Sequence, residues 1–415
     1  MKKSFKLLTI ASAIAAISQG AHADEAKGIT EAIKDGKVTL NFRMRYEDVT
    51  QDVNGGSDKD ADALTLRTRL TYETASYKGF SGLIEVDDVT ELGSVDYNTA
   101  PNDSSHPNAA TISDPEGTEV NQSWVAYTHK KNTLKYGRQR ILLDNQRFVG
   151  GVGFRQNEQT YDALTFTSKA ISDTEIFLSH ITRVNRIFGE DSSLGDHDNS
   201  TNLLNVSYKG LAIGKLTGYY YDIDNEDVAI MSTQTTGIRL AGKANNFGYT
   251  FEYASQSDAH DNTRSYDADY YLLEGSAKLG DFNFKIGHEV LGADDNDGYF
   301  ITPLATLHKF QGWSDKFLNK GVGNISGGLT DTYATVGTKL GDIKVLLVYH
   351  QISADDDSVA GTDDYGNEYG LVVASKVGPV GLSLKYAKFS EDIDSTALTQ
   401  VTDTNKLWLT ASAKF

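Results

Sequence analysis

A segment near the start of the chain, residues 37–47 (KVTLNFRMRYE), alternates strictly between apolar and polar side chains. Two arginines, Arg43 and Arg45, occupy polar positions, and Phe42 and Met44 occupy apolar ones. A period of two over this length predicts a β-strand with one apolar and one polar face. In a soluble sandwich the apolar face is buried in the core, whereas in an outer-membrane barrel it contacts lipid and the polar face lines the lumen. The rest of the chain has to distinguish these two folds.

The same alternation recurs as far as the last residue. The alternating segments are about 10 residues long, which is the length that a tilted transmembrane strand requires. Clear examples are residues 64–72, 247–253, 282–290 and 407–415. The connections alternate between short turns that contain lysine, such as 339–342, and long acidic loops, such as 292–325. Short turns on one side and long loops on the other are typical of bacterial outer-membrane barrels, in which the short turns are periplasmic and the long loops extracellular.

Proline and aromatic residues agree with this interpretation. All five prolines lie in the predicted loops or turns, as a closed barrel requires, because proline cannot donate to the strand ladder. The chain ends on an aromatic residue, Phe415, and we expect Tyr219, Tyr220 and Tyr221 near the outer aromatic girdle. The sequence therefore predicts an all-β fold, a closed antiparallel transmembrane β-barrel of about 18 strands, with 16 as the alternative count.

The first residues predict export from the cytoplasm. Three lysines precede an apolar run that is too short to cross a bilayer, and Ala21-His22-Ala23 follows as a cleavage motif. We predict a signal peptide at 1–23, a short leader at 24–36, for which a helix is one option, and the barrel at 37–415. Beyond the signal, no stretch reaches the roughly 20 consecutive apolar residues of a membrane helix.

The charge and composition exclude several classes of function. The formal net charge is −18, and removing the three signal lysines leaves 36 basic against 57 acidic residues, a net charge of −21. This balance argues against nucleic acid as a partner. The chain has no cysteine, and its histidines lack the spacing of a zinc site, so we expect neither a metal nor another cofactor. Hydrophobic residues make up only 39%, which suits a barrel with a water-filled interior.

Residues 115–166 carry more specific motifs. Their order is PEGTEVNQ at 115–122, YGRQR at 136–140, DNQRFVG at 144–150, FRQN at 154–157 and YDALTF at 161–166. This order resembles the alginate-export family of outer-membrane porins. The resemblance implies an 18-stranded monomeric barrel with an arginine-rich lumen that passes anionic solutes.

The parity of the strands assigns side chains to the lumen. If Phe42 and its apolar neighbours face lipid, then Arg43 and Arg45 face inward, together with Arg67 and Arg69 on the next strand. Arginine on the lipid face near the midplane costs about 2–4 kcal/mol, which favours the inward assignment. Glu85 and Asp87 on the third strand are their nearest candidate partners. The arginines either form a basic wall that concentrates anions or form a network with acids that braces the barrel.

The family-like segment supplies further candidate pore residues. We expect residues 140–160 to fold inward as a constricting loop whose bases meet Asp162 or acids of other loops. Parity points Arg138 outward unless the strand bulges or ends at Gly137. Ordinary charges at the rim of the barrel are the alternative role for each of these residues. The candidates from this segment and from later strands are Arg138, Arg140, Arg147, Arg155, Asp162, Arg183 and Arg239.

We therefore predict an outer-membrane channel for passive diffusion or export of small hydrophilic, preferentially anionic, solutes. Its expected surroundings are outer-membrane lipid and lipopolysaccharide. Two other classes stay open: an outer-membrane barrel enzyme, and a structural or adhesion barrel. An energised receptor would need a plug domain, but only about 14 residues separate the predicted cleavage site from the first predicted strand.

Overall fold

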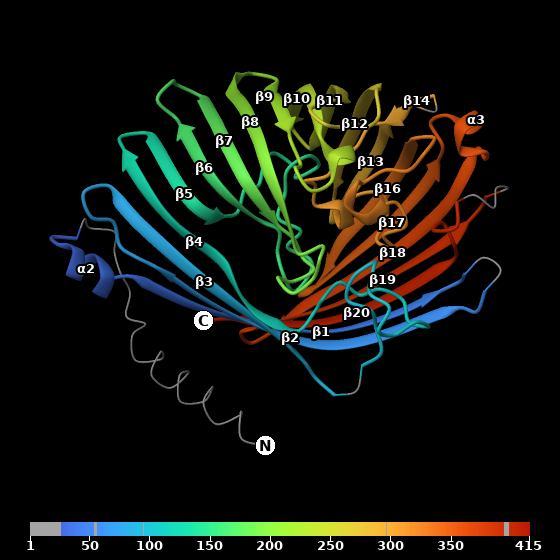
Figure 1. Ribbon diagram of the computed structural model, residues 1–415, viewed down its shortest axis with the longest axis horizontal. Helices are drawn as coiled ribbons and strands as arrows, with labels where there is room; N and C mark the ends of the chain where they lie inside the picture. Colours follow the sequence, from blue (N-terminus) through green and yellow to red (C-terminus); the bar gives the residue numbers. More distant parts are fainter. Residues whose placement is uncertain (1–25, 54–55, 94, 296, 394–397) are drawn as a thin grey trace.

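The computed structural model describes residues 26–53, 56–93, 95–295, 297–393 and 398–415. Eighteen long strands form a single antiparallel sheet that closes on itself, because the first strand, β1 (Lys37–Gln51), pairs with the last, β20 (Thr404–Lys414) (Figure 1). The closed antiparallel barrel of 18 strands predicted from the sequence is confirmed. The predicted signal peptide at 1–23 lies outside the described residues.

The short helix α2 (Ile29–Lys34) precedes β1, within the predicted leader. The remaining barrel strands are β2 (Lys59–Glu73), β3 (Phe80–Glu91), β4 (Gly117–His129), β5 (Asn132–Gln139), β6 (Thr160–Ser168), β7 (Thr174–Asn185), β8 (Asp196–Leu211), β9 (Gly214–Ile223), β10 (Thr233–Ala244), β11 (Phe247–Asp258), β12 (Asp267–Leu279), β13 (Phe282–Leu291), β16 (Leu329–Leu340), β17 (Ile343–Ser353), β18 (Asp364–Val377) and β19 (Val380–Glu391). The shorter elements are η1 (Ala229–Met231), β14 (Ala293–Asp294), β15 (Gly298–Tyr299), η2 (Leu307–Lys309), η3 (Asn319–Gly321) and α3 (Asp357–Ala360).

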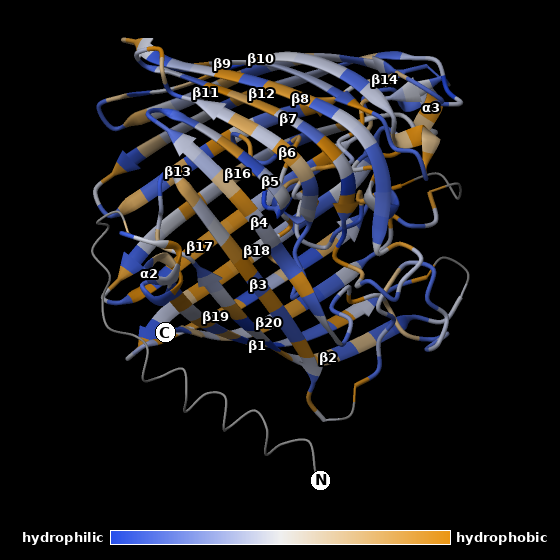
Figure 2. Cartoon of the chain, turned by 60° about the vertical axis from the view of Figure 1, so that its left-hand side comes forward, coloured by the Kyte–Doolittle hydropathy of each residue, from blue (hydrophilic) through white to orange (hydrophobic). Residues whose placement is uncertain are grey.

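The two faces of each strand differ as the alternation of the sequence requires. Bands of hydrophobic and hydrophilic residues follow each other along the strands in Figure 2. Large apolar side chains such as Met44, Phe251 and Ile286 are exposed on the outer face, at 44%, 49% and 62%. Polar side chains of the intervening positions, such as Glu47 and Thr65, are buried against material inside the barrel. Among the described residues, no helix has the length and apolar character needed to span a bilayer.

The same alternation corrects the expectation for the tyrosine triplet. Successive residues of a strand point to opposite faces, so three in a row cannot all lie in a girdle. Tyr220 is exposed at 39%, whereas Tyr219 and Tyr221 are buried inside the barrel and stack on each other, with ring centroids 4.8 Å apart.

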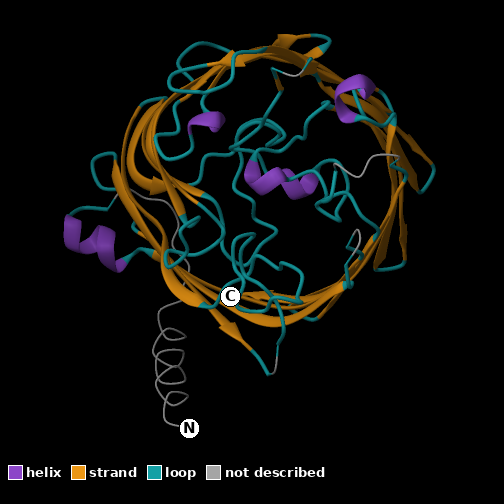
Figure 3. Cartoon of the chain, turned by 45° about the vertical axis from the view of Figure 1, so that its right-hand side comes forward, coloured by secondary structure: helices purple, strands orange, loops and turns teal. Residues whose placement is uncertain are grey.

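Two long connections fold into the barrel, where loops and short helical turns occupy the interior (Figure 3). The first inner loop, residues 140–159, joins β5 to β6, and the second inner loop, residues 292–328, joins β13 to β16. They contact each other through a parallel bridge between Val149 and Leu304, and the backbone N–H of Gly150 donates to the Leu304 carbonyl at 2.8 Å. The largest buried apolar cluster joins both inner loops to the wall.

Candidate functional site

The barrel wall carries four arginines opposite the first inner loop. Arg43 and Arg67 are cross-strand partners on β1 and β2, so antiparallel pairing sets them side by side on one face. Arg45 and Arg69 occupy the same face two residues further along each strand. We call these four residues the arginine wall.

Two members of the arginine wall, Arg43 and Arg45, bind neutral oxygens of the first inner loop. The Arg43 guanidinium donates to Gln156 Oε1 at 2.9 Å and to the backbone carbonyl of Gly153 at 2.9 Å, and also bonds the carbonyl of Arg155. Arg45 donates to the Phe154 carbonyl at 2.7 Å and lies over the Phe154 ring. These contacts hold the loop against the wall.

Arg67, like Arg43, has only uncharged hydrogen-bond partners. It donates to Asn41 Oδ1 at 2.8 Å and, more weakly, to the Gln156 carbonyl at 3.4 Å. Its Nε is buried and has no hydrogen-bond partner among the described residues. Neither Arg43 nor Arg67 makes an ion pair with a carboxylate of the described residues. Asp114 acts electrostatically on Arg43 from a greater distance, and Asp87 and Glu158 act in the same way on Arg67.

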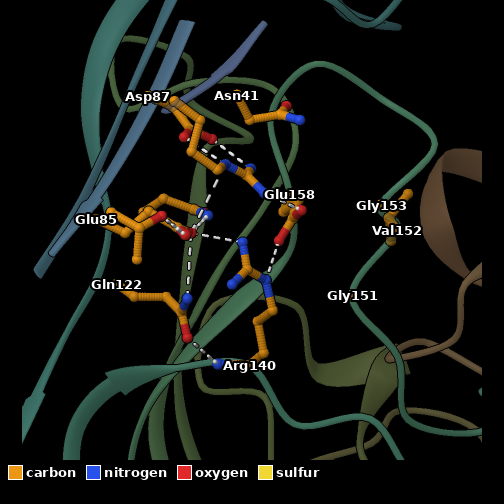
Figure 4. A network of polar contacts seen from close by, with 12 residues as sticks. Asn41, Glu85, Asp87, Gln122, Arg140, Gly151, Val152, Gly153 and Glu158 are labelled. Carbon is orange, nitrogen blue, oxygen red and sulfur yellow. Dashed lines mark hydrogen bonds and ion pairs between the residues drawn. The ribbon is translucent and has the colours of Figure 1, made fainter. Parts of the chain in front are cut away.

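Arg69 is, in contrast, surrounded by acids. It forms a bidentate pair with Asp87, at 2.6 and 2.5 Å, and binds Glu158 of the first inner loop at 2.5 Å. Arg140 binds the same Glu158 and also Glu85, with 2.5 Å between Arg140 Nη2 and Glu85 Oε1. Figure 4 shows this network around Glu85, Asp87, Arg140 and Glu158.

Two acids of this network hold it together. Glu85 also accepts hydrogen bonds from Thr71, Asn121 and Gln122, so the strand carboxylate is fully saturated. Burial alone would raise the pKa of Glu158, but Arg69 and Arg140 outweigh burial and hold its pKa at about 2. Glu158 is therefore ionised at neutral pH and fixes the end of the first inner loop to the wall.

The other arginines of the first inner loop are buried in ion pairs. Arg155 binds Glu47 at 2.8 Å and lies 3.5 Å from Asp315 of the second inner loop. Arg147, which is fully buried, binds Glu289 of β13 at 2.8 Å and donates to Thr302 at 3.0 Å. These residues cross-link the two inner loops and the wall.

Arg239 occupies the opposite side of the barrel. It forms an ion pair with Glu252 on the neighbouring strand β11, and Glu252 also accepts from the Tyr219 hydroxyl at 3.0 Å. Lys285 on β13 is also paired, with Glu274 at 2.8 Å. Arg239 and Lys285 therefore each have a carboxylate partner.

Three of the residues predicted to line the pore do not face the lumen: Arg138, Asp162 and Arg183. The register of β5 and β6 runs without interruption from Tyr136–Leu164, which is an exposed apolar pair, to Arg138–Asp162. Because positions two apart share a face, Arg138 and Asp162 lie on the outer face, where they form a bidentate pair at 2.8 and 3.1 Å. The strand continues through Gly137 to Gln139, so no bulge turns Arg138 inward.

Arg183 follows the same outer face. It pairs with Asp162 across β6 and β7, and its guanidinium binds Asp198 of β8 at 2.7 Å while remaining 42% exposed. The prediction that Arg138, Asp162 and Arg183 line the pore is therefore corrected: they form a row of charges on the outside of the barrel.

Sequence reasoning missed a lysine enclosed by aromatic rings. Lys385 on β19 lies 3.9 Å from the Trp313 ring centroid, 4.6 Å from that of Phe154 and 5.1 Å from that of Trp408. Its Nζ is 2.7 Å from His308 Nε2. The strand parity of Lys385 and Trp408 was available from the sequence, but the two inner-loop aromatics that complete the enclosure were not.

His308 links Lys385 to a second set of charged residues. Its Nδ1 is 2.7 Å from Asp315, which also binds Lys406 at 2.9 Å. Burial lowers the pKa of His308 to about 3, so the ring is neutral at physiological pH. A neutral ring can accept from the Lys385 ammonium, which joins the second inner loop to β19.

A closed 18-stranded barrel with inward-folded loops and a charged interior defines an outer-membrane channel of the porin class. The sequence model of the family described as "Alginate export" matches residues 36–281, more than half of the chain. The chain belongs to the alginate export family.

Solved structures show the same fold at low sequence identity. OccAB2 of Acinetobacter baumannii is 17% identical, with a TM-score of 0.71 over 92% of this chain and 98% of that one. OccK3 (OpdO) of Pseudomonas aeruginosa is 13% identical, with a TM-score of 0.67 over 94% and 98%. OpdK of Pseudomonas aeruginosa, solved with vanillate, is 12% identical, with a TM-score of 0.67 over 92% and 99%. No curated protein sequence matches the chain.

Proposed function

We propose that the channel passes small hydrophilic solutes by passive diffusion or export and prefers anions, with the arginine wall as the selective element. The proposal includes a single chain as the conducting unit, outer-membrane lipid and lipopolysaccharide around it, and no catalytic role.

One observation carries the anion preference. The guanidiniums of Arg43 and Arg67 donate to amide and carbonyl oxygens and form no ion pair with a carboxylate of the described residues. An uncompensated charge in a narrow, water-filled passage raises the local concentration of counter-ions. The proposal therefore assigns the anion preference to these two guanidiniums beside the first inner loop, although the chain as a whole is acidic.

The test is the reversal potential of single channels in a planar bilayer under a KCl gradient. The unmodified protein is expected to be anion-selective. Arg43→Ala/Arg67→Ala is expected to lower the anion-to-cation permeability ratio by about fivefold, which corresponds to roughly 1 kcal/mol. Lys59→Ala/Lys388→Ala, which removes two charges from the long-loop side, is the matched control. A cation-selective channel that the double arginine substitution leaves unchanged would refute the proposal.

An enzymatic role has little support in the geometry. The neighbours Ser179 and His180 lie on one strand, so their side chains point to opposite faces: Ser179 is buried inside, and His180 is exposed and binds Asn202 at 3.0 Å. The solved structures of similar fold are porins. We therefore propose transport alone.

A further inference from the structure

The short-turn end of the barrel carries a series of exposed lysines on β1 and on strands between β8 and β20. Eight of them lie at the ends of eight different strands, and all eight are exposed. We call them the lysine collar: Lys37, Lys209, Lys243, Lys278, Lys339, Lys344, Lys376 and Lys414.

Strand parity places the collar on the inner face. Lys278 is four residues after Glu274, whose carboxylate binds Lys285 and Tyr333 inside the barrel. Lys376 is eight residues after Glu368, which accepts from the backbone N–H of Trp313 in the second inner loop. Even spacing on a strand keeps these residues on one face. Lys243 is likewise four residues after Arg239 on β10, so it lies on the same inner face.

The residues next to three of the collar lysines point to the opposite face of the barrel wall. Leu279, Leu340 and Val377 each follow a collar lysine directly and are 56%, 62% and 65% exposed on the outer face. Each of these strands therefore ends with an apolar side chain toward lipid and an ammonium toward the mouth of the lumen. The collar is a feature of the aqueous mouth and not of the lipid boundary.

The collar has few counter-ions. Lys339 lies 3.5 Å from Asp342, an exposed contact between residues three apart that contributes little. The other seven collar lysines make no ion pair with the described residues. Their charges are therefore available to a ligand.

Three of the lysines converge on one cavity. Lys278, Lys339 and Lys344 line a hollow of about 400 Å³, and its other lining residues include Asn283, the acidic Asp281 and apolar residues such as Leu346. Lys339 and Lys344 are direct cross-strand partners, which fixes their spacing. Such a group matches a ligand with several negative oxygens better than a monovalent ion, because each additional charge engages another ammonium.

We propose that the lysine collar is a binding vestibule for multivalent oxyanions, such as polyphosphates or polycarboxylates, at the short-turn mouth. This inference rests on the proposed channel function and adds to it a second anion site, separate from the arginine wall. The long loops at the other mouth are acidic, so the channel is electrically asymmetric. Multivalent anions therefore enter from the short-turn side.

The experiment uses inorganic pyrophosphate as the probe on channels inserted in one orientation in a planar bilayer. Pyrophosphate added on the short-turn side is expected to block the chloride current at a lower concentration than on the long-loop side. In Lys278→Gln/Lys339→Gln/Lys344→Gln, the blocking concentration on that side is expected to rise about tenfold, from the loss of three exposed charge contacts. Lys59→Gln/Arg264→Gln/Lys388→Gln removes the same charge from the long-loop side and is expected to leave the block unchanged.

Calorimetric titration of the detergent-solubilised protein with pyrophosphate provides a second measurement that does not depend on conduction. Binding that weakens in the collar variant and not in the control supports the vestibule. Block that is equal from both sides, or insensitive to the collar variant, overturns the vestibule and leaves the channel function intact. A protein that carries no current overturns the channel function, and an absence of pyrophosphate binding in the titration then overturns the vestibule as well.

Discussion

Arg43 on β1 donates from Nε to the side-chain oxygen of Gln156 in the first inner loop at 2.9 Å, across 113 residues of sequence. The Gln156 amide in turn donates to Thr65 Oγ1 on β2 at 2.8 Å. A single glutamine thus joins the arginine wall, its neighbouring strand and the loop. The wall supplies charge to the passage and also holds the loop that narrows it.

Replacing Gln156 by alanine is therefore expected to loosen the first inner loop. Arg43 Nε and the buried Thr65 hydroxyl lose their partner, and leaving such groups unpaired costs about 1–3 kcal/mol. The variant is expected to show noisier single-channel currents and faster proteolysis within 140–159, while the barrel stays intact. Gln234→Ala, which removes an exposed glutamine, provides the control. Currents and cleavage identical to those of the unmodified protein would contradict this role.

The attachment of Glu158 to Arg69 and Arg140 is expected to depend on pH. The pKa of Glu158 in the folded protein is about 2, below its ordinary value of 4.5, because the two guanidiniums outweigh the effect of burial. A lowered folded-state pKa adds stability above the unfolded-state value, and this stability is lost as the pH falls through the folded-state value. The midpoint of thermal unfolding in detergent is therefore expected to fall between about pH 4.5 and pH 2.

Glu158→Gln isolates this contribution. The neutral amide cannot titrate, so the part of the pH dependence between about 4.5 and 2 that arises from this residue is expected to disappear. At pH 7 the variant is expected to be less stable by about 3 kcal/mol, because two partly buried guanidiniums lose a charged partner. A variant with the full pH dependence of the unmodified protein would assign that dependence to other carboxylates.

The Arg147–Glu289 pair makes a different prediction, because Arg147 is fully buried. Arg147→Met is expected to destabilise the protein by about 3–5 kcal/mol, since Glu289 is left as an uncompensated buried charge. Arg147→Met/Glu289→Gln is expected to recover most of this loss, since no charge remains. Thermal unfolding of the three proteins measures the effect. If the double variant is no more stable than the single one, the buried charge is not the cause.

The barrel itself was predictable because its determinants are local. The period of two, the lysine-containing turns and the proline positions each depend on a few consecutive residues. Together they predicted about 18 strands, with 16 as the alternative, and the inward orientation of Arg43 and Arg67. The contacts of those arginines were not predictable. Gln156 and Glu158 approach the wall through a loop whose path depends on packing against the second inner loop, and no local pattern encodes that path.

For Arg138, the alternation of side chains along the strand gave the correct orientation, and the family-like motif gave the wrong one. Parity pointed it outward, but membership in an arginine-rich motif favoured the lumen and required a bulge at Gly137. That glycine has a φ of 120°, a conformation that other residues rarely adopt, yet the register continues through it. Gly137 instead allows its backbone to lie close to β4, because a Cβ atom at this position would be only 2.3 Å from the Ser123 carbonyl oxygen.

The opposite orientations of Arg138 and Arg140 supply a direct test of the parity argument. Arg138 pairs with Asp162 on the outer face, whereas Arg140 binds Glu85 and Glu158 inside. Arg140→Ala is expected to change both the conductance and the ion selectivity, because it removes a lumen charge and releases Glu158. Arg138→Ala is expected to leave both unchanged, because its charge is screened from the lumen by the strand wall and neutralised by Asp162. Single-channel recordings of the two variants under one salt gradient measure the conductance and the reversal potential of each. If Arg138→Ala shifts the reversal potential as much as Arg140→Ala does, then β5 does not present Arg138 to the outside.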